Sequence, residues 1–177
     1  MQIKLFLLLF FFGGLVGNTV AHPDTKDSVS VYIFLHDACV ISQNYTLMLN
    51  ELAATFSSDE LSFVGVFPDF SSKPDKIEAF REKYKITFPL KTDYFKTLTQ
   101  KMGATITPEV VVFDHQQEEI LYKGRIDNSY FRVGKRRTVT TTSELEDALR
   151  AITNGEPVAV KETPAIGCII SMRTPSN

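Results

Sequence analysis

The feature that most constrains the fold is an alternation of two hydrophobic patterns along the first half of the chain. The segments SVYIFLH (30–36) and LSFVGVFPD (61–69) are short runs of β-branched and aromatic residues, which are typical of buried strands. Each is followed by a segment in which apolar residues recur every three or four positions, a spacing that predicts an amphipathic helix. The chain therefore predicts an α/β fold that begins strand, helix, strand, helix.

The second half of the chain predicts shorter elements. In order, they are a short strand at 88–93, a short helix at 94–103, strands at 104–114 and 118–127, and a last helix at 141–155. A polar turn around His115 separates the two longer strands, so a hairpin is expected there. Gly103 and Gly155 are typical helix stops. Arg125 is expected to form an ion pair on this hairpin, with Asp127 or Glu119.

The N-terminus has the layout of a secretory signal. Lys4 precedes a long apolar run, and small residues lead up to Ala21, where signal peptidase would cut. An uncleaved membrane anchor is the alternative, although the run is shorter than the ~20 residues that a spanning helix needs. We therefore predict a signal peptide at 1–21, a domain at 22–155 and a tail at 156–177, in a periplasmic or extracellular protein without stable membrane insertion after cleavage.

Composition excludes several classes of partner. The chain has 177 residues, of which 44% are hydrophobic, and 19 basic residues balance 21 acidic ones. This charge balance gives no general attraction to nucleic acid or to anionic membranes, and no nucleic-acid partner is predicted. One local exception is FRVGKRR (131–137), which is either a solvated loop or a basic rim for an anionic partner.

The chain has two cysteines, and both lie in the part predicted to be exported. Cys39 stands where the first strand pattern gives way to the first helix pattern, and Cys168 lies in the tail. A helix N-terminus favours thiolate over thiol, so Cys39 is a candidate nucleophile; the alternative is a small buried hydrophobe. His36 is a candidate catalytic helper that adds positive charge or moves a proton, unless it only forms a local hydrogen bond.

Pro108 extends this pattern into a resemblance to a known fold. It stands just before a strand, where a proline cannot sit within the ladder and is best explained by a specific turn. The order of elements and the Thr107–Pro108 pair resemble the thioredoxin fold, in which a cis-proline faces the active cysteine. This resemblance implies a thioredoxin-like α/β fold with a central mixed sheet flanked by helices and a C-terminal extension. It also implies that Thr107 and Pro108 contribute to substrate binding.

The whole exported chain resembles the redoxins of the alkyl hydroperoxide reductase and thiol-specific antioxidant superfamily, and in particular an exported subgroup. The segments that carry this resemblance are DACVISQNY (37–45), TPEVVVFD (107–114), LYKGRIDNSYFRVGKRR (121–137) and PAIGCII (164–170). Two departures matter. Ser42 stands where dithiol members have a second cysteine, and His36 stands where typical peroxiredoxins have threonine or serine.

These observations favour an exported thiol-disulfide oxidoreductase that acts on protein or small-molecule thiols and disulfides. Cys39 would attack, and Cys168 is the candidate resolving partner through a reversible disulfide, with Gly167 permitting close backbone approach. One alternative is a peroxide-reducing antioxidant, against which His36 counts. The other is a binding module with a fixed structural disulfide. No cofactor and no metal are predicted, because the cysteines and histidines lack metal-site spacing, and the sequence defines no oligomeric state.

Overall fold

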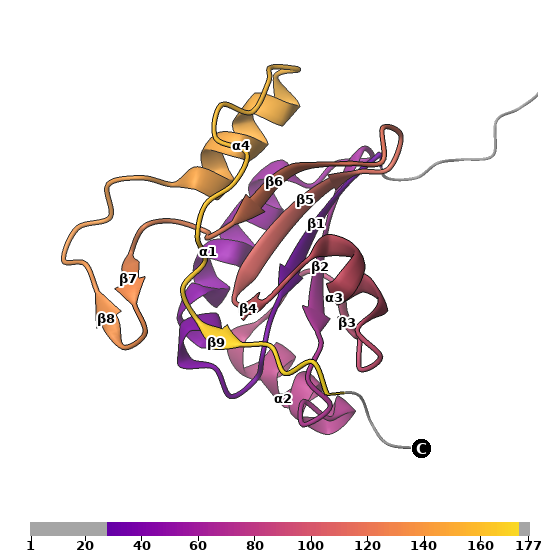
Figure 1. Ribbon diagram of the computed structural model, residues 1–177, viewed down its shortest axis with the longest axis vertical. Helices are drawn as coiled ribbons and strands as arrows, with labels where there is room; N and C mark the ends of the chain where they lie inside the picture. Colours follow the sequence, from indigo (N-terminus) through magenta and orange to yellow (C-terminus); the bar gives the residue numbers. More distant parts are fainter. Residues whose placement is uncertain (1–27, 174–177) are drawn as a thin grey trace, which may run out of the picture.

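The computed structural model describes residues 28–173 and places a mixed β-sheet at the centre of the chain (Figure 1). The predicted signal peptide at 1–21 lies outside the described residues. The helices are α1 (Val40–Phe56), α2 (Pro74–Tyr84), α3 (Thr97–Met102) and α4 (Glu144–Thr153). The strands are β1 (Val29–Phe34), β2 (Leu61–Phe67), β3 (Leu90–Thr92), β4 (Ile106–Thr107), β5 (Glu109–Asp114), β6 (Glu119–Gly124), β7 (Tyr130–Arg132), β8 (Lys135–Arg136) and β9 (Cys168–Ile169).

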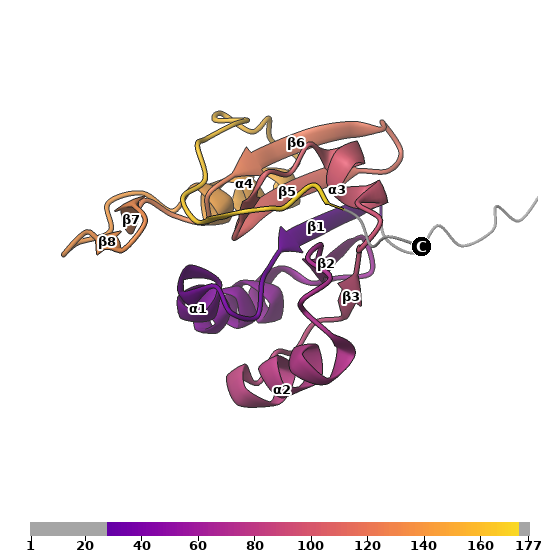
Figure 2. The same cartoon turned by 60° about the horizontal axis from the view of Figure 1, so that its bottom comes forward.

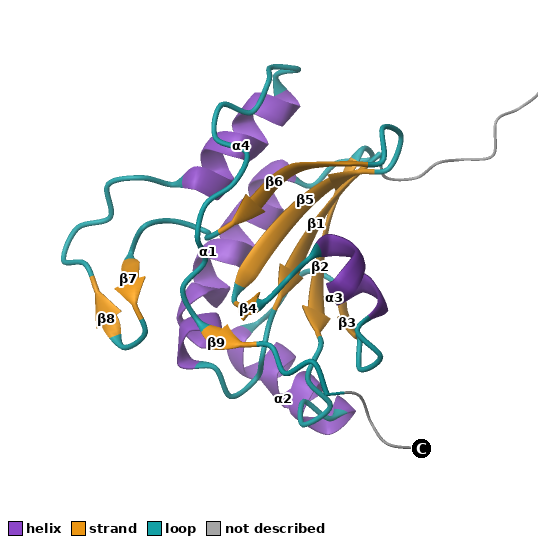
Figure 3. Cartoon of the chain, viewed as in Figure 1, coloured by secondary structure: helices purple, strands orange, loops and turns teal. Residues whose placement is uncertain are grey.

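Within the described residues, the central sheet has five strands in the order β3-β2-β1-β5-β6 (Figure 3). The first three run parallel, since β1 pairs with β2 and β2 with β3 through helical crossovers. Strand β5 pairs antiparallel with β1 and with β6, so the predicted hairpin is confirmed. The predicted mixed sheet flanked by helices is likewise confirmed.

Alternating side chains of the strands form two separate hydrophobic clusters, one on each face of the sheet. Val31 and Ile33 of β1 face the first cluster, which also receives apolar side chains from α1, α2 and α4. Tyr32 and Phe34 face the second cluster, which receives Met102 at the end of α3. Figure 2 shows α1 and α2 on one side of the sheet and α3 on the other. The predicted helices therefore bury the faces that their periodicity indicated.

The predicted strand at 104–114 is divided in the structure. Proline cannot donate a hydrogen bond to a strand ladder, and Pro108 separates β4 from β5. Strand β4 leaves the central sheet and pairs with β9 of the tail in a two-stranded sheet. The interruption thus creates a separate edge at the end of the sheet where the tail can bind.

The described part of the tail, residues 156–173, returns along the domain. Its first part runs beside β6, where the amide of Lys123 donates to the carbonyl of Lys161 at 2.9 Å. It then crosses to β4, so that β9 lies at the lower end of the sheet in Figure 1. Among residues 28–173, no helix has the length and apolar character needed to cross a membrane.

Candidate active site

Cys39 is the residue immediately before the first turn of α1, as predicted. Its backbone is extended, and its carbonyl accepts the first helical hydrogen bond, from the amide of Gln43 at 3.0 Å. The preceding loop closes on itself, because the amide of Cys39 donates to the carbonyl of His36 at 3.0 Å. The side chain is only 2% exposed. A thiol in this position lies at the positive end of the helix dipole.

The loop that contains Pro108 lies against this thiol. The Thr107–Pro108 peptide bond is cis, which confirms the conformation expected from the resemblance. The Sγ atom of Cys39 donates to the carbonyl oxygen of Thr107 at 3.2 Å. Thr107 is buried, and its hydroxyl donates to the carbonyl of Cys168 at 3.3 Å. The roles of Thr107 and Pro108 in substrate binding remain a prediction.

The tail brings the second cysteine to the first. The Sγ atoms of Cys168 and Cys39 lie 2.8 Å apart, although 129 positions separate the two residues in the sequence. Both are free thiols in the structure, and Cys168 is exposed whereas Cys39 is buried. The expected close approach of Gly167 is found, but to the carbonyl of Thr107 and not to Cys39 itself. The geometry therefore places the two sulfur atoms within reach of each other.

The environment shifts the two pKa values in opposite directions. Burial raises the pKa of Cys39, but hydrogen bonds from Cys168, Ser42 and the amide of Ile41 outweigh burial, so its pKa is lowered. Burial also raises the pKa of Cys168, and its hydrogen bond to Cys39 and the negative charge there raise it further. The pKa shifts therefore favour loss of a proton from Cys39 before Cys168, and the role of Cys39 as the nucleophile remains a prediction.

His36 lies in the loop before Cys39 without a hydrogen bond to its sulfur. Its Nδ1 atom accepts from the amide of Ala38 at 3.0 Å, and its Nε2 atom lies 3.4 Å from the hydroxyl of Ser71. Within the described part of the chain, no hydrogen bond joins the imidazole to Sγ of Cys39. His36 thus supports the turn that leads into α1, and its role as a catalytic helper remains a prediction.

A comparison with protein families assigns the chain. The family model of the AhpC/TSA family matches residues 7–139. The chain belongs to the AhpC/TSA family. No curated protein matches it significantly. This assignment agrees with the superfamily expected from the four segments of the sequence.

Solved structures of similar fold support the thioredoxin-like architecture of this AhpC/TSA member. A hypothetical protein of Sinorhizobium meliloti matches with a TM-score of 0.72 and 21% identity, covering 85% of this chain and 82% of that one. An uncharacterized conserved protein of Geobacillus kaustophilus matches with 0.71 and 24% identity, covering 85% and 80%. A secreted disulfide oxidoreductase of Mycobacterium tuberculosis matches with 0.51 and 16% identity, covering 70% and 81%. At these identities the likeness establishes the fold.

The basic segment of this AhpC/TSA chain forms a small hairpin away from the cysteines. Arg132 belongs to β7, Lys135 and Arg136 form β8, and all three are exposed, as is Arg137. The hairpin is attached to α1, because Asn44 donates to the hydroxyl of Tyr130 at 2.6 Å. Whether its positive charge attracts an anionic partner remains a prediction.

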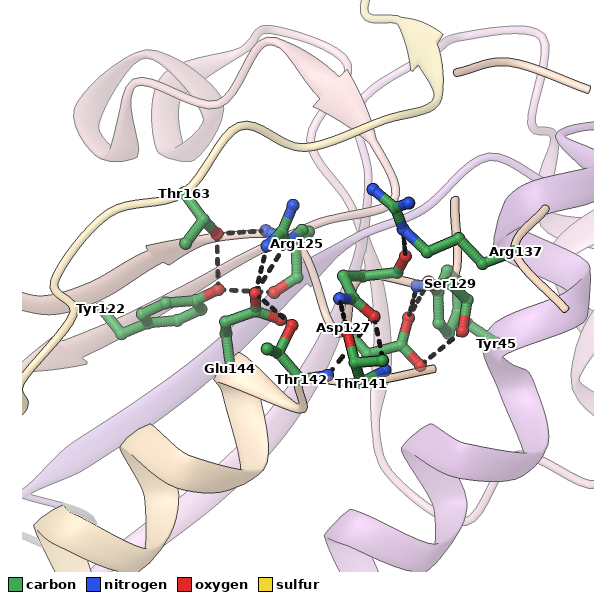
Figure 4. Close-up of polar contacts among 11 residues, drawn as sticks. Tyr45, Tyr122, Arg125, Asp127, Ser129, Arg137, Thr141, Thr142, Glu144 and Thr163 are labelled. Carbon is green, nitrogen blue, oxygen red and sulfur yellow. Dashed lines mark hydrogen bonds and ion pairs between the residues drawn. The ribbon is translucent and has the colours of Figure 1, made fainter. Parts of the chain in front are cut away.

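The prediction that Arg125 pairs with Asp127 or Glu119 is wrong. Arg125 bonds the carboxylate of Glu144 at the start of α4, at 2.9 Å from Nε, and neither Asp127 nor Glu119 takes that place (Figure 4). Asp127 is buried and accepts instead from the hydroxyls of Tyr45 and Ser129. The sequence did not predict this contact, because Arg125 and Glu144 are 19 positions apart and meet only when α4 packs against β6.

Sequence reasoning missed the contribution of Ser42. The residue was recognised only as the absence of a second cysteine, yet its hydroxyl and its amide both hydrogen-bond Cys39 and lower the pKa of that thiol. Its side chain is fully buried. Its position three residues after Cys39, in the first turn of the helix, is the signal that would have identified it. Among residues 28–173, no group of three or more potential ligand side chains is placed to hold a metal ion.

Proposed function

We propose that this protein is an exported thiol-disulfide oxidoreductase in which Cys39 attacks and Cys168 resolves. The observation that carries the proposal is the 2.8 Å approach of the two sulfur atoms at the N-terminus of α1, next to the Thr107–Pro108 bond. Export is supported by the signal pattern at 1–21 and by the secreted disulfide oxidoreductase that shares the fold.

The first step is an exchange at Cys39. Its thiolate attacks one sulfur of a substrate disulfide, a Cys39–substrate disulfide forms, and the other substrate sulfur leaves as a thiolate. The lowered pKa of Cys39 supports this assignment, because the thiolate is the reactive form. The extended backbone next to Pro108 can pair with a polypeptide, so protein disulfides are suitable substrates. His36 acts in this step as a positioning residue that holds the loop before Cys39.

The second step is resolution by Cys168. Its thiol gives its proton to solvent and attacks Sγ of Cys39, so the Cys39–Cys168 disulfide forms and the second substrate thiolate leaves. The pKa of Cys168 is raised partly by the Cys39 thiolate. Burial is the larger cause, but the contribution of Cys39 disappears once Cys39 is in the mixed disulfide, so the first step makes Cys168 more reactive. An external thiol reductant then restores both thiols.

The test compares two single substitutions in a disulfide-reduction assay with a protein disulfide and excess thiol reductant. We expect Cys39→Ser to abolish exchange. In a single turnover without added reductant, we expect pre-reduced Cys168→Ser to complete the first step and to accumulate a mixed disulfide, which intact-protein mass spectrometry detects as an added substrate mass. Equal activity of the parent and Cys39→Ser would overturn the proposal.

Two further measurements separate the alternatives. Rapid formation of sulfenic acid at Cys39 with hydrogen peroxide would favour the peroxide-reducing reaction, for which His36 stands in the place of the usual threonine or serine. A Cys39–Cys168 disulfide that resists millimolar thiol reductant would favour the binding module with a structural bond. For an oxidoreductase we expect a bond that glutathione redox buffers can both form and break.

A further inference from the structure

Three successive residues of the tail occupy the free edge of β4. Cys168 lies opposite Thr107 and Ile169 opposite Ile106 in antiparallel register, and the amide of Ile170 donates to the carbonyl of Thr105 at 2.8 Å. In Figure 3 this strand lies next to β4 at the lower end of the sheet. The edge next to Thr107 and Pro108, where a polypeptide substrate would pair, is therefore already filled by the chain itself.

The same contact covers the nucleophile. Cys39 is 2% exposed, and its sulfur contacts the carbonyl of Thr107 on one strand of this small sheet and the sulfur of Cys168 on the other. A substrate disulfide cannot align with Sγ of Cys39 while β9 stays in place. Any substrate must take the position of β9 on the edge.

The tail residues show what this position accepts. A Cβ atom on Gly167 would lie 2.1 Å from the carbonyl oxygen of Thr107, which is backbone and cannot turn away, so only glycine fits before the cysteine. Ile169 is 83% exposed, so the residue after the cysteine is unrestricted. Ile170 is 4% exposed and packs in the second hydrophobic cluster with residues such as Met102 and Ala104.

We propose that the edge of β4 is a binding site for an extended segment of a partner protein with the pattern glycine, cysteine, any residue, large aliphatic residue, and that β9 is its tethered competitor. The proposal rests on the proposed function, because the cysteine of the segment would be the one that exchanges with Cys39. Backbone pairing along the edge supplies the orientation, and the burial of Ile170 in the second hydrophobic cluster and the contact at Gly167 supply the selectivity.

The test measures docking without exchange chemistry. A fluorescein-labelled peptide with the sequence of residues 165–171 and serine in place of cysteine is titrated with the reduced full chain, and its anisotropy is followed. We expect Ile170→Asp to bind the peptide at least tenfold more tightly than the parent, because the variant tail leaves the edge. Ile169→Asp, a change at the exposed neighbour, is the matched control and should bind like the parent.

Three altered peptides test selectivity against the Ile170→Asp chain. Alanine in place of the glycine and aspartate in place of the last aliphatic residue should each weaken binding at least tenfold, whereas threonine in place of the residue after the serine should not change it. Gly167→Ala serves as a second opened chain in case Ile170→Asp fails to fold, because it disturbs the tail at a different contact. Equal binding of all four peptides, or no gain in either opened chain, would overturn the proposal.

A reactive peptide separates this proposal from the function on which it rests. The cysteine form of the peptide is supplied as a mixed disulfide with glutathione; Cys39 attacks the peptide sulfur and glutathione leaves as a thiolate. Selective docking without exchange would support the proposed binding site and contradict the proposed oxidoreductase function. Equally fast exchange with the glycine and alanine peptides would support the proposed oxidoreductase function and contradict the proposed selectivity.

Discussion

At the scale of single residues, the chemistry of the site depends on the hydrogen bonds that the first turn of α1 donates to the sulfur of Cys39. Cys39 is buried, which by itself would make its thiol inert, and hydrogen bonds reverse that effect. A hydrogen bond to a charged group contributes about 1.5–3 kcal/mol, and one pKa unit corresponds to about 1.4 kcal/mol. A single donor to the thiolate therefore changes the balance between burial and hydrogen bonding at Cys39.

Ser42→Ala tests this balance. The substitution removes the hydroxyl that bonds Cys39, and we expect the pKa of Cys39 to rise because the thiolate loses a charge-assisted hydrogen bond. The measurement is the pH dependence of iodoacetamide alkylation at Cys39, followed by peptide mass spectrometry. Ser30→Ala, at a buried serine of β1, is the control and should leave the profile in place. A superimposable profile for Ser42→Ala would contradict the assignment.

His36 can be tested in the same assay with two substitutions. His36→Ala removes the acceptor for the amide of Ala38, and we expect a loss of about 1 kcal/mol in the free energy of unfolding together with slower alkylation of Cys39. His36→Asn offers an oxygen acceptor and should restore both. If asparagine restores stability but not the alkylation rate, the imidazole itself acts on the thiolate and its role exceeds positioning.

At the scale of elements, the sequence was sufficient for the strands and helices that bury a periodic face. Helix α1 and strand β2 follow from patterns of apolar residues that repeat locally. Strands β4 and β9 are two residues each, and neither carries a pattern. They exist because Pro108 ends one ladder and the tail supplies another, which is a contact between distant parts of the chain. Local periodicity contains no information about such pairs.

The ion pair of Arg125 and Glu144 joins the end of β6 to the start of α4, a contact that the sequence did not predict. Its carboxylate is mostly buried, and we expect Glu144→Gln to lower the free energy of unfolding at pH 7 by about 2 kcal/mol, because the charge-assisted bonds from Arg125 are lost. For a chain of this size that corresponds to a melting temperature roughly 4–8 °C lower. Glu146→Gln, which breaks the exposed Arg150 pair on the same helix, should cost less than about 0.5 kcal/mol.

The same pair predicts a pH dependence. Burial raises the pKa of Glu144, but hydrogen bonds from Arg125 and Thr142 outweigh burial and lower it below its ordinary value. A lowered folded-state pKa stabilises the protein above the unfolded-state pKa, about 4.3, and this stabilisation is lost as pH falls through the folded-state value. The stability difference between the parent and Glu144→Gln should therefore shrink as the pH is lowered below about 4. A constant difference down to pH 3 would contradict this account.

At the scale of the whole molecule, the tail determines how the site works. It runs from the edge of β6 to the edge of β4, and the contact of Thr163 with Gly124 fixes its direction: a Cβ on Gly124 would lie 2.3 Å from the Thr163 carbonyl. The sequence predicted that the tail returns to the domain with Cys168. It could not predict the register opposite Thr107, because register depends on this packing and on the burial of Ile170 in the second hydrophobic cluster.

A bond between the two cysteines would close almost the whole described chain into a loop. The residues are 129 positions apart, and in the chain-entropy model a disulfide across such a separation stabilises the folded state by about 4–5 kcal/mol relative to the reduced chain. The structure holds the sulfur atoms together before any bond forms, so oxidation requires little rearrangement of β9. We therefore expect oxidation to raise the urea concentration at which half of the parent is unfolded. Far-ultraviolet circular dichroism is the measurement, because the chain contains no tryptophan for fluorescence.

Cys168→Ser and Cys39→Ser control this experiment, because each retains one thiol and cannot form the bond. Both variants should unfold at the same urea concentration in oxidised and reduced glutathione, close to the midpoint of the reduced parent. If the oxidised parent unfolds at the same urea concentration as the reduced parent, the bond is absent. A midpoint shift that persists in either serine variant would mean that glutathione acts elsewhere on the chain. Only a shift confined to the parent connects the long return of the tail to the chemistry at Cys39, because it requires both sulfur atoms and the path between them.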